Sequence, residues 1–486
     1  MASWLIHVYN LAWLLARPVL RRHHRLRDGF AWRLVPEDWA GTPETKTGLP
    51  PRADIWIQAA SGGEAYLAWA IAERLPALYR QQGQPSKNDG NASPHAAPNV
   101  KETADQSPNA PLRLLVTTWT RQGLEILQGM RSKLESTHPG LSIHVTFFPL
   151  DSVPLMTRAL RQARPRVVAL LETELWPGLM LACSRQNIPL LVLNGRMNEK
   201  SLLQYRKLDR FSPNFWKDTA PQHIAATSRE YANRFAELFD KNRVEVVPNI
   251  KFDNASVNEV RQADNGSMPP AAPELAALLP RQEHSGRTVL LASVREEEEE
   301  KILAVIRHLR SGKERTPTII LAPRHMHRVN PWLEQLHREG LTPLTRAERK
   351  DAFPAGSLIV WNRFGELRDL YELSDAVFVG GSLAPLGGQN FLEALAAGKI
   401  PCCGPWLDNF DWALQDAAES GEKNDSLESR GLLRRCPDAN AVAVALKQFL
   451  AAPRDPVTVQ KEFHAWLSPR QGGASRCAGL LLTCLE

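Results

Sequence analysis

The chain has few of the residues that build metal centres or disulfide frameworks. Only six of its 486 residues are cysteines, and none of them forms a C-x-x-C pair. No D-x-D occurs, and no histidine and carboxylate set has the spacing of a metal site. The sequence therefore predicts reduced, cytoplasmic thiols and a site that works without a metal or another cofactor. The cysteines are Cys183, Cys402, Cys403, Cys436, Cys477 and Cys484.

The chain also lacks an uninterrupted hydrophobic run that would cross a bilayer comfortably. The apolar stretch 4–20 is broken by His7, Asn10 and Arg17 and falls short of the ~20 residues that such a span needs. Tryptophans within this stretch and arginines behind it are typical of a helix on an anionic membrane. We therefore expect residues 1–30 to form a membrane anchor or amphipathic helix that contacts membrane lipids. The alternative is a soluble amphipathic helix packed on its own domain.

The excess of positive charge is small. The formal net charge is +6, and the arginines crowd the N-terminal region instead of forming stripes along the chain. Nucleic acid is therefore not an expected partner, whereas a local anionic surface is. By the positive-inside rule, we expect the body of the protein to stay on the cytoplasmic face of the membrane.

The rest of the sequence alternates short β-rich runs with segments of helix length. Runs such as RVVALLE and DAVFVGG are apolar on both faces, which is the pattern of parallel sheets covered by helices. We predict an α/β protein with two Rossmann-like, doubly wound domains and an interdomain ligand cleft. The predicted parts are an N-terminal domain at 31–257 with a disordered insertion at 82–111, a linker at 258–286, a C-terminal domain at 287–465, and a helix at 466–486 that crosses back to the N-terminal domain.

A glycine-rich stretch at 375–410 has the pattern of a nucleotide-binding site. A buried strand ends in Gly381 and Ser382, and a helix is expected to open near Asn390 with Glu393 one turn in. Backbone N–H groups at such a helix start form a phosphate site, and a carboxylate one turn in is placed to accept hydrogen bonds from ribose hydroxyls. The alternative is that the glycines only turn the chain.

The ordered motifs resemble those of the Kdo (3-deoxy-D-manno-octulosonic acid) transferases of lipid A assembly, inverting glycosyltransferases of the GT-B fold. The resemblance covers nearly the whole chain except the 82–111 insertion, and the order of the motifs is more specific than any one of them. The motifs are SGGE (61–64), TTWTRQG (117–123), FFPLDSVP (147–154), ETELWPGL (172–179), NGRMNEKS (194–201), NIKFD (249–253), APRH (322–325), FGELRDLYELSD (364–375), GGSLAPLGGQNFLEALAAGK (380–399) and GPWLDNF (404–410).

This resemblance implies a CMP-Kdo donor and a lipid A precursor, lipid IVA, as acceptor, in lipopolysaccharide synthesis at the inner membrane. It implies that the C-terminal domain binds the donor and the N-terminal domain the acceptor. Arg324 is expected to meet the phosphate, unless it forms a surface ion pair, and Glu393 to hold the ribose. The expected nucleotide-binding residues are Arg324, Gly365, Glu366, Leu367, Gly381, Ser382, Asn390 and Glu393.

Glu64 lies where a helix is expected to begin after a strand, and it resembles the catalytic base of this family. A sugar hydroxyl is a poor nucleophile, so a carboxylate that takes its proton assists the attack. One base without a second, covalent carboxylate suits a single displacement with inversion. The helix dipole lowers the pKa of such a group and burial raises it, so the sequence leaves the outcome open. The alternative role is a helix-start charge without chemistry.

Other charged residues extend the expected site. Glu172 and Glu174 follow a predicted strand, and the resemblance implicates an acidic group here in activity, whereas helix capping is the alternative. Arg196 and Lys251 are expected to meet carboxylate or phosphate groups, unless they are ordinary surface cations. The expected substrate-binding residues are Gly63, Thr118, Arg196 and Lys251.

Two other functions fit the same pattern. A different GT-B nucleotide-sugar enzyme, such as a UDP-GlcNAc 2-epimerase, is disfavoured by the N-terminal anchor. A catalytically silent GT-B scaffold is disfavoured because it needs neither Glu64 nor the nucleotide site. Gly62 and the pair 294–295 depart from the family pattern, and the second departure puts one polar contact of the C-terminal domain in doubt. The acidic run at 295–309 is interpreted as a structural helix.

Overall fold

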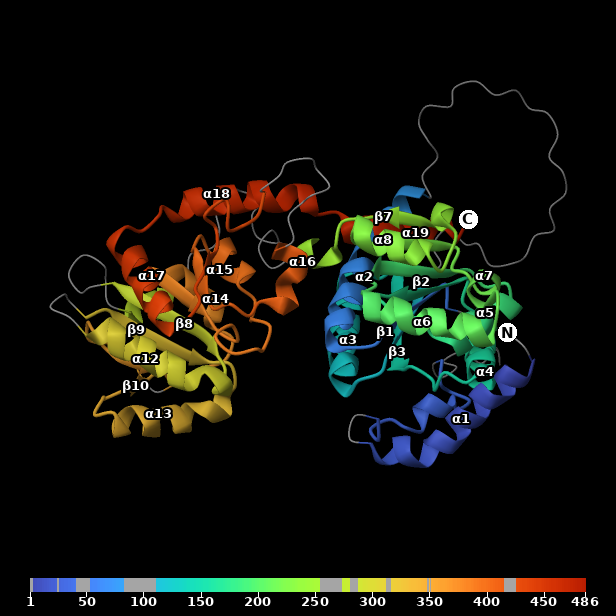
Figure 1. Cartoon of the computed structure of the whole chain (residues 1–486), viewed down its shortest axis with the longest axis horizontal. Coiled ribbons are helices and arrows are strands. Elements are labelled where there is room, and N and C mark those ends of the chain that lie inside the picture. The colour runs from blue at the N-terminus through green and yellow to red at the C-terminus, as the bar shows by residue number, and fades with distance from the viewer. Residues whose placement is uncertain are drawn as a thin grey trace, which may run out of the picture. The chain divides into compact units, whose positions relative to one another are not determined.

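A computed structural model describes residues 3–23, 26–40, 53–82, 111–253, 273–279, 287–311, 316–347, 349, 351–414 and 425–486. The chain forms two compact units (Figure 1). The first comprises Met1–Asn254 with Gln471–Glu486, and the second comprises Ala255–Arg470. Each unit has its own sheet and its own hydrophobic core, which is the definition of a domain.

The first unit is built on a seven-stranded parallel sheet. In sheet order the strands are β3 (Leu141–Phe147), β2 (Leu112–Thr118), β1 (Ile55–Ala59), β4 (Val167–Leu171), β5 (Leu190–Gly195), β6 (His223–Ala226) and β7 (Val244–Val246). The helices are α1 (Ser3–Arg22), α2 (Gly62–Gln82), α3 (Arg121–Thr137), α4 (Val153–Ala163), α5 (Pro177–Arg185), α6 (Glu199–Phe211), α7 (Phe215–Asp218), α8 (Arg229–Ala236) and α19 (Gly473–Thr483).

The strands of this sheet are apolar on both faces because helices cover both faces. Trp56 points into a core that it shares with α4 and α5. Its neighbours Ile55 and Ile57 point the other way, into a core shared with α2, α3 and α19. The chain's last helix, α19, therefore completes the core of the first unit.

The second unit repeats this architecture with a second seven-stranded parallel sheet. In sheet order the strands are β10 (Leu344–Thr345), β11 (Leu358–Val360), β9 (Thr318–Pro323), β8 (Thr288–Val294), β12 (Ala376–Val379), β13 (Pro401–Cys403) and β14 (Arg434–Arg435). The helices are α10 (Pro273–Leu278), α12 (Glu299–Arg310), α13 (Val329–Arg338), α14 (Leu367–Leu373), α15 (Leu392–Ala396), α16 (Asp411–Leu414), α17 (Ala439–Ala451) and α18 (Pro456–Leu467). The predicted α/β class with two doubly wound parallel-sheet domains is confirmed.

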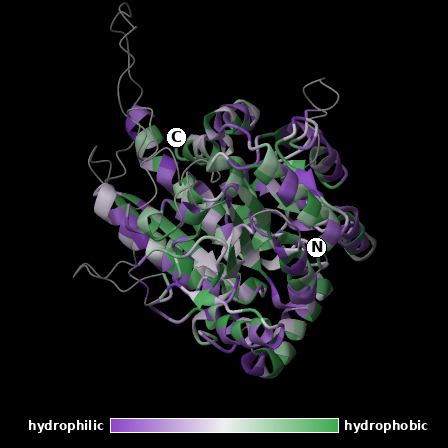
Figure 2. Cartoon of the chain, turned by 90° about the vertical axis from the view of Figure 1, so that its left-hand side faces the viewer, coloured by the Kyte–Doolittle hydropathy of each residue, from purple (hydrophilic) through white to green (hydrophobic). Residues whose placement is uncertain are grey.

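The helices carry both hydrophilic and hydrophobic residues along their length (Figure 2). Helix α12 is an example: Ile302, Val305 and Ile306 are buried, whereas the charged side chain of Arg307 is more than half exposed. This pattern is expected for a helix with one face on a sheet and the other in water. The prediction that the acidic run 295–309 is structural is confirmed, because it forms the start and the body of α12.

Both sheets have a point at which the strand order reverses direction. In the first unit this point lies between β1 and β4, and in the second between β8 and β12. Connections leave such neighbouring strands toward opposite faces, so a crevice opens at their carboxyl ends and receives ligands in open α/β sheets. Chemically active residues are therefore expected directly after these four strands.

The predicted linker at 258–286 is not a continuous linker. Its residues 273–278 form α10, which buries Leu275 and Leu278, and the Phe353 N–H donates to the Leu278 carbonyl at 2.7 Å. Two apolar side chains at helical spacing are sufficient for this docking. The rest of the predicted linker and positions 83–110 of the predicted insertion lie outside the described residues.

Helix α1 packs on the first unit through one face. Ile6 is buried, Trp13 and Leu20 lie against apolar residues of the first unit, and Tyr9 and Asn10 make hydrogen bonds to it. The opposite face leaves large apolar side chains exposed. None of the helices in the ranges given above is long and apolar enough to span a membrane. The exposed side chains are Trp4, Val8, Leu11, Leu14, Leu15 and Val19.

Candidate functional site

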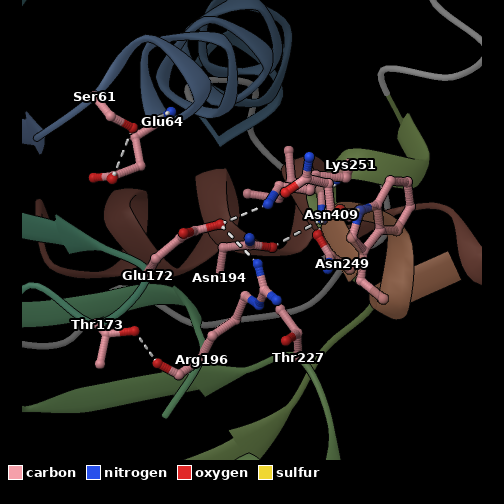
Figure 3. Close-up of polar contacts among 12 residues, drawn as sticks. Ser61, Glu64, Glu172, Thr173, Asn194, Arg196, Thr227, Asn249, Lys251 and Asn409 are labelled. Atoms are coloured by element: carbon pink, nitrogen blue, oxygen red, sulfur yellow. Dashed lines mark hydrogen bonds and ion pairs between the residues drawn. The ribbon is translucent and has the colours of Figure 1, made fainter. Parts of the chain in front are cut away.

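Glu64 lies in the first turn of helix α2, which follows β1 at the switch point of the first unit (Figure 3). Its carboxylate accepts hydrogen bonds from the Ala60 N–H at 2.7 Å and from the Ser61 hydroxyl at 3.1 Å. The Glu64 N–H in turn faces the Ser61 oxygen at 3.4 Å. S-x-x-E at a helix start is the capping-box spacing, so Glu64 has a structural role at the start of α2.

Burial dominates the ionisation of Glu64, whose side chain is only 7% exposed. Loss of water raises its pKa to about 8, and the nearby carboxylates of Glu174 and Glu172 add to this rise. The hydrogen bonds from Ala60 and Ser61 oppose the rise but do not cancel it. The sequence left open whether the helix dipole or burial sets the pKa of Glu64, and burial has the larger effect. A carboxyl group with this pKa is a proton acceptor of useful strength near neutral pH.

Gly63 is not required by packing inside the first unit. A Cβ at this position would approach only the Ser61 hydroxyl, at 3.8 Å, which is an ordinary contact. At Gly62 a Cβ would come within 3.2 Å of the Gln122 side chain. The fold thus leaves open space beside Gly63, next to Glu64.

Glu172 follows β4 and lies in a left-handed backbone conformation, with φ +54°. Such a conformation is strained for a residue with a side chain, and strained residues cluster at functional sites. Its carboxylate lies 2.9 Å from the Lys251 ammonium and 3.6 Å from the Arg196 guanidinium (Figure 3). The two cations that we expected to meet substrate anions are therefore both placed against Glu172.

Two asparagines hold this ion-pair cluster, and the sequence analysis missed them. Asn194, with φ +54°, is the penultimate residue of β5 and accepts a hydrogen bond from the Ile250 N–H at 2.9 Å. Asn249 accepts one from the Lys251 N–H at 3.0 Å. Asparagine tolerates the left-handed conformation and bonds nearby backbone, so its presence in both NGR and NIKFD was an available signal.

The two other expected residues of this unit differ in accessibility. Glu174 is partly buried, and burial raises its pKa to about 6, with a further rise from Glu172. It therefore joins Glu64 and Glu172 in one electrostatically coupled group. Thr118 ends β2 and is fully buried, with its hydroxyl 3.5 Å from the Thr120 N–H. The prediction that Thr118 contacts a substrate is not supported by this structure, because its side chain has no accessible surface.

The second unit contains a cavity of about 550 Å³ at the carboxyl ends of β8, β9 and β11. Several of the expected nucleotide-binding residues line it. Phe364 presents a ring that is 79% exposed, and Gly365 beside it has φ +90°, a conformation that favours glycine. The expected residues that line the cavity are Arg324, Gly365, Leu367, Asn390 and Glu393.

The charged groups of this cavity come from two segments. The Arg324 guanidinium, directly after β9, donates to the Gln389 side chain at 3.0 Å. Asn390 donates to the Glu393 carboxylate at 2.8 Å, and burial raises the pKa of Glu393. Glu366 is not a lining residue of this cavity, because it accepts a hydrogen bond from the Trp361 indole at 3.1 Å and pairs with Arg363. The Glu366 side chain therefore has a structural role, and the expected contact of the FGEL stretch with the nucleotide stays a prediction.

Two of the expected nucleotide-binding residues, Gly381 and Ser382, lie in the glycine turn after β12, where their N–H groups bond within the protein. The N–H groups of Gly381 and Ser382 donate to the carboxylate of Glu298, at 2.6 and 3.2 Å. Glu298 is fully buried and also accepts from Leu383 at 3.2 Å and from Arg295 at 2.9 Å. The protein thus supplies its own anion to this turn, and the two N–H groups are already satisfied.

Ser293 is a cavity residue that the sequence analysis missed. It adopts φ +53° where the pairing of β8 with β9 shifts register, and a Cβ at Gly380 would lie 2.5 Å from its carbonyl. This strained turn places Ser293 in the lining of the cavity at the carboxyl end of the sheet. No local sequence signal marks it, because a serine is compatible with many conformations.

Two doubly wound parallel sheets, each with polar groups at the carboxyl ends of its strands, are the architecture of the GT-B fold. Residues 93–254 match the family model described as 3-deoxy-D-manno-octulosonic-acid transferase (kdotransferase). The 3-deoxy-D-manno-octulosonic acid transferase of Bordetella pertussis is 26% identical over 93% of this chain and 92% of its own length. That of Haemophilus influenzae is 25% identical over 90% and 88%.

Several solved structures also match this chain, and one of them is a domain of a Kdo transferase relative. The C-terminal CMP-Kdo binding domain of WaaA from Acinetobacter baumannii is 26% identical, covers 38% of this chain and 90% of that domain, and has a TM-score of 0.32. The family model and the long alignments to the two curated relatives support the identification of this chain as a Kdo transferase.

Proposed function

We propose that this protein transfers Kdo from CMP-Kdo to a lipid A precursor, lipid IVA, in lipopolysaccharide synthesis. The observation that carries the proposal is the buried carboxyl group of Glu64 at the β1–β4 switch point, with a pKa raised to about 8. The family relationship supports the transferred sugar, and the cavity of the second unit supports a nucleotide donor.

In the proposed reaction, Glu64 accepts the proton of the acceptor hydroxyl as that oxygen attacks the anomeric carbon of Kdo. The bond between this carbon and the CMP phosphate oxygen breaks, and its electron pair leaves with CMP. One proton acceptor without a covalent carboxylate gives a single displacement with inversion. The Glu172 carboxylate, which pairs with Lys251 and Arg196, adds to the rise that burial causes in the pKa of Glu64.

The cavity of the second unit is proposed to bind the CMP part of the donor. Arg324 is placed to neutralise the phosphate, which must leave with its charge compensated. The exposed ring of Phe364 provides a stacking surface for the base, and Glu393 accepts from the ribose hydroxyls.

Product analysis tests the proposed reaction directly. Purified protein is mixed with freshly generated CMP-Kdo and a tetraacylated lipid A precursor in detergent, and the lipid is analysed by mass spectrometry. Mass increments of one or more Kdo units are expected. CMP binding without any increment would contradict the proposed acceptor, and transfer from another nucleotide sugar but not from CMP-Kdo would contradict the proposed donor.

Replacing Arg324 with methionine is expected to weaken CMP binding by roughly 10- to 100-fold. The change keeps most of the side-chain volume but removes a charge-assisted contact to phosphate, and such contacts contribute about 1.5–3 kcal/mol. Titration calorimetry with CMP measures the change. Arg307→Met is the matched control, because Arg307 lies on α12 outside the cavity and pairs with Glu339. Equal affinities of the two variants would remove Arg324 from the phosphate site.

We further infer that α1 lies on the cytoplasmic face of the inner membrane. Its exposed residues Trp4, Val8, Leu11 and Leu15 recur at helical spacing on one face, and arginines follow at 21 and 22. An apolar stripe beside cations is the pattern of helices that bind the headgroup region of anionic membranes.

The triple variant Leu11→Ser, Leu15→Ser, Val19→Ser is expected to lower the affinity for anionic vesicles by at least about tenfold, because each buried aliphatic side chain contributes about 1.5–3 kcal/mol. Vesicle flotation measures the bound fraction. Val457→Ser, an exposed apolar residue of α18, is the control. Binding that is unaffected by the triple change would contradict the assignment of α1 as the membrane-binding element.

A further inference from the structure

Asp151 is a fully buried carboxylate outside the group formed by Glu64, Glu172 and Glu174. It accepts hydrogen bonds from the N–H groups of Gly178 and Leu179, at 2.8 and 2.7 Å. These are two of the first N–H groups of α5, whose own capping residue, Trp176, offers no side-chain acceptor. A residue from another element therefore caps this helix, and capping carboxylates stabilise a helix start.

The start of α5 is also the end of the segment 172–176, which carries Glu172 and Glu174. The segment is short, so the positions of its two ends determine where its side chains lie. Its first end is held by the Glu172 N–H, which donates to the Leu193 carbonyl at 3.1 Å. Its second end is held by Asp151. The contact at Gly178 is so close that a Cβ there would lie 2.1 Å from the Asp151 carbonyl.

Helix α1 contributes the third hydrogen bond to this carboxylate. The Tyr9 hydroxyl donates to Asp151 at 2.6 Å, and burial together with the Asp151 charge raises the pKa of Tyr9, so the hydroxyl remains a donor. The next residue of α1, Asn10, accepts from the Val153 N–H at the start of α4, at 3.0 Å. Asn10 thus accepts directly from the start of α4, whereas Tyr9 donates to Asp151, the carboxylate that caps α5.

We propose that Asp151 is a positioning residue for the transfer reaction: it holds the 172–176 segment through the start of α5, and Tyr9 makes this position depend on the docking of α1. The proposal rests on the proposed transferase function. Burial raises the pKa of Asp151 to about 7, although the hydrogen bonds from its three donors lower it. These donors are therefore the groups that stabilise the charged form of Asp151.

Tyr9→Phe and Asn10→Ala in the full-length protein separate this role from general stabilisation. Tyr9→Phe removes only the hydroxyl and keeps the ring beside Trp13. Asn10→Ala removes a hydrogen bond between the same helix and the same unit, but at α4. Hydrogen exchange measured on peptides that cover 178–179 is expected to be about tenfold faster in Tyr9→Phe and unchanged in Asn10→Ala.

Steady-state kinetics with CMP-Kdo and the lipid A precursor in detergent provide the second readout. Tyr9→Phe is expected to lower kcat about tenfold with an unchanged KM for the donor, because a small displacement of acidic groups at a reacting centre reduces the rate more than donor binding. Asn10→Ala is expected to keep kcat within about twofold of the wild type. Asp151→Asn, if it folds, is expected to show the same faster exchange at 178–179 and the same lower kcat as Tyr9→Phe.

Two results would overturn the proposal. One is unchanged exchange at 178–179 in Tyr9→Phe. The other is an equal loss of kcat in Tyr9→Phe and Asn10→Ala, which would mean that α1 acts only through overall stability. A wild-type protein that transfers no Kdo would contradict the proposed function instead, and the exchange rates would still decide whether Tyr9 holds the start of α5.

Discussion

Replacing Glu64 with glutamine is expected to lower the rate of Kdo transfer by about 10²- to 10⁴-fold while CMP binding stays unchanged. The amide keeps the shape of the side chain and an acceptor for the Ala60 N–H, but it cannot take a proton from a sugar hydroxyl. A well-placed general base contributes a factor of this size. The proposed CMP site is the cavity of the second unit, which Glu64 does not line.

Initial rates in detergent and calorimetry with CMP measure the two halves of this expectation. Glu125→Gln, an exposed residue of α3 that pairs with Arg121, controls for the loss of one negative charge from the first unit. A Glu64→Gln enzyme that retains the wild-type rate would refute the assignment of Glu64 as the base and leave it only as a helix cap.

The pH dependence of the wild-type rate follows from the same group. A base works in its ionised form, and the pKa of Glu64 is raised to about 8. We therefore expect kcat to rise with pH and to reach half of its plateau near that value. A rate that is already constant above about pH 6 would mean that the reacting carboxylate has an ordinary pKa.

The raised pKa also links Glu64 to stability. Between its ordinary value of 4.5 and about 8, the folded protein holds a proton that the unfolded chain has released. The contribution of Glu64 to the free energy of unfolding is therefore complete below this range and is lost as pH rises through it. Glutamine does not titrate. Calorimetric unfolding should therefore show that the free energy of unfolding of Glu64→Gln rises relative to that of the wild type between about pH 5 and about pH 9.

The second large effect is expected from Glu298→Ala, which should destabilise the second unit by roughly 3–5 kcal/mol. The carboxylate of Glu298 satisfies four backbone N–H groups in a fully buried site. Each buried donor left without an acceptor costs about 1–3 kcal/mol, although partial relaxation reduces the sum. The N–H groups of Gly381 and Ser382 are among the four, so the turn after β12 is expected to loosen.

Urea unfolding measured by circular dichroism checks this expectation. Glu297→Ala is the matched control from the same acidic run, because Glu297 is about half exposed and pairs with Arg295 at 3.4 Å. Exposed pairs of this kind contribute little, so the control should differ from the wild type by less than about 1 kcal/mol. Equal destabilisation by the two substitutions would contradict the role assigned to Glu298.

The fold class was predictable because its signal is local and repeated. Apolar runs such as 167–171 are buried on both faces, and several such runs separated by helix-length segments are typical of a parallel sheet covered by helices on both sides. The start of α2 was predictable for the same reason, since the S-x-x-E spacing of Ser61 and Glu64 acts within one turn. The helix within the predicted linker was missed because it contributes only a few apolar residues.

The errors at the site concern contacts between residues that are distant in the chain. The N–H groups of Gly381 and Ser382, two expected nucleotide-binding residues, donate to Glu298, which lies 83 residues before Gly381. Arg196 and Lys251 meet Glu172 because β4 and β5 are neighbours and Asn194 at the end of β5 anchors the Lys251 turn. Nothing in the local sequence of these residues indicates such pairings.

The sequence by itself determined the two-domain α/β class, the family relationship and the position of Glu64 at the start of a helix. Each of these depends on periodicity, capping or motif order, which neighbouring residues specify. Only the tertiary structure decided the ionisation of Glu64, the partners of Glu172 and the role of the glycine turn after β12. Burial and charge depend on which strands become neighbours, and that is settled when the whole chain packs.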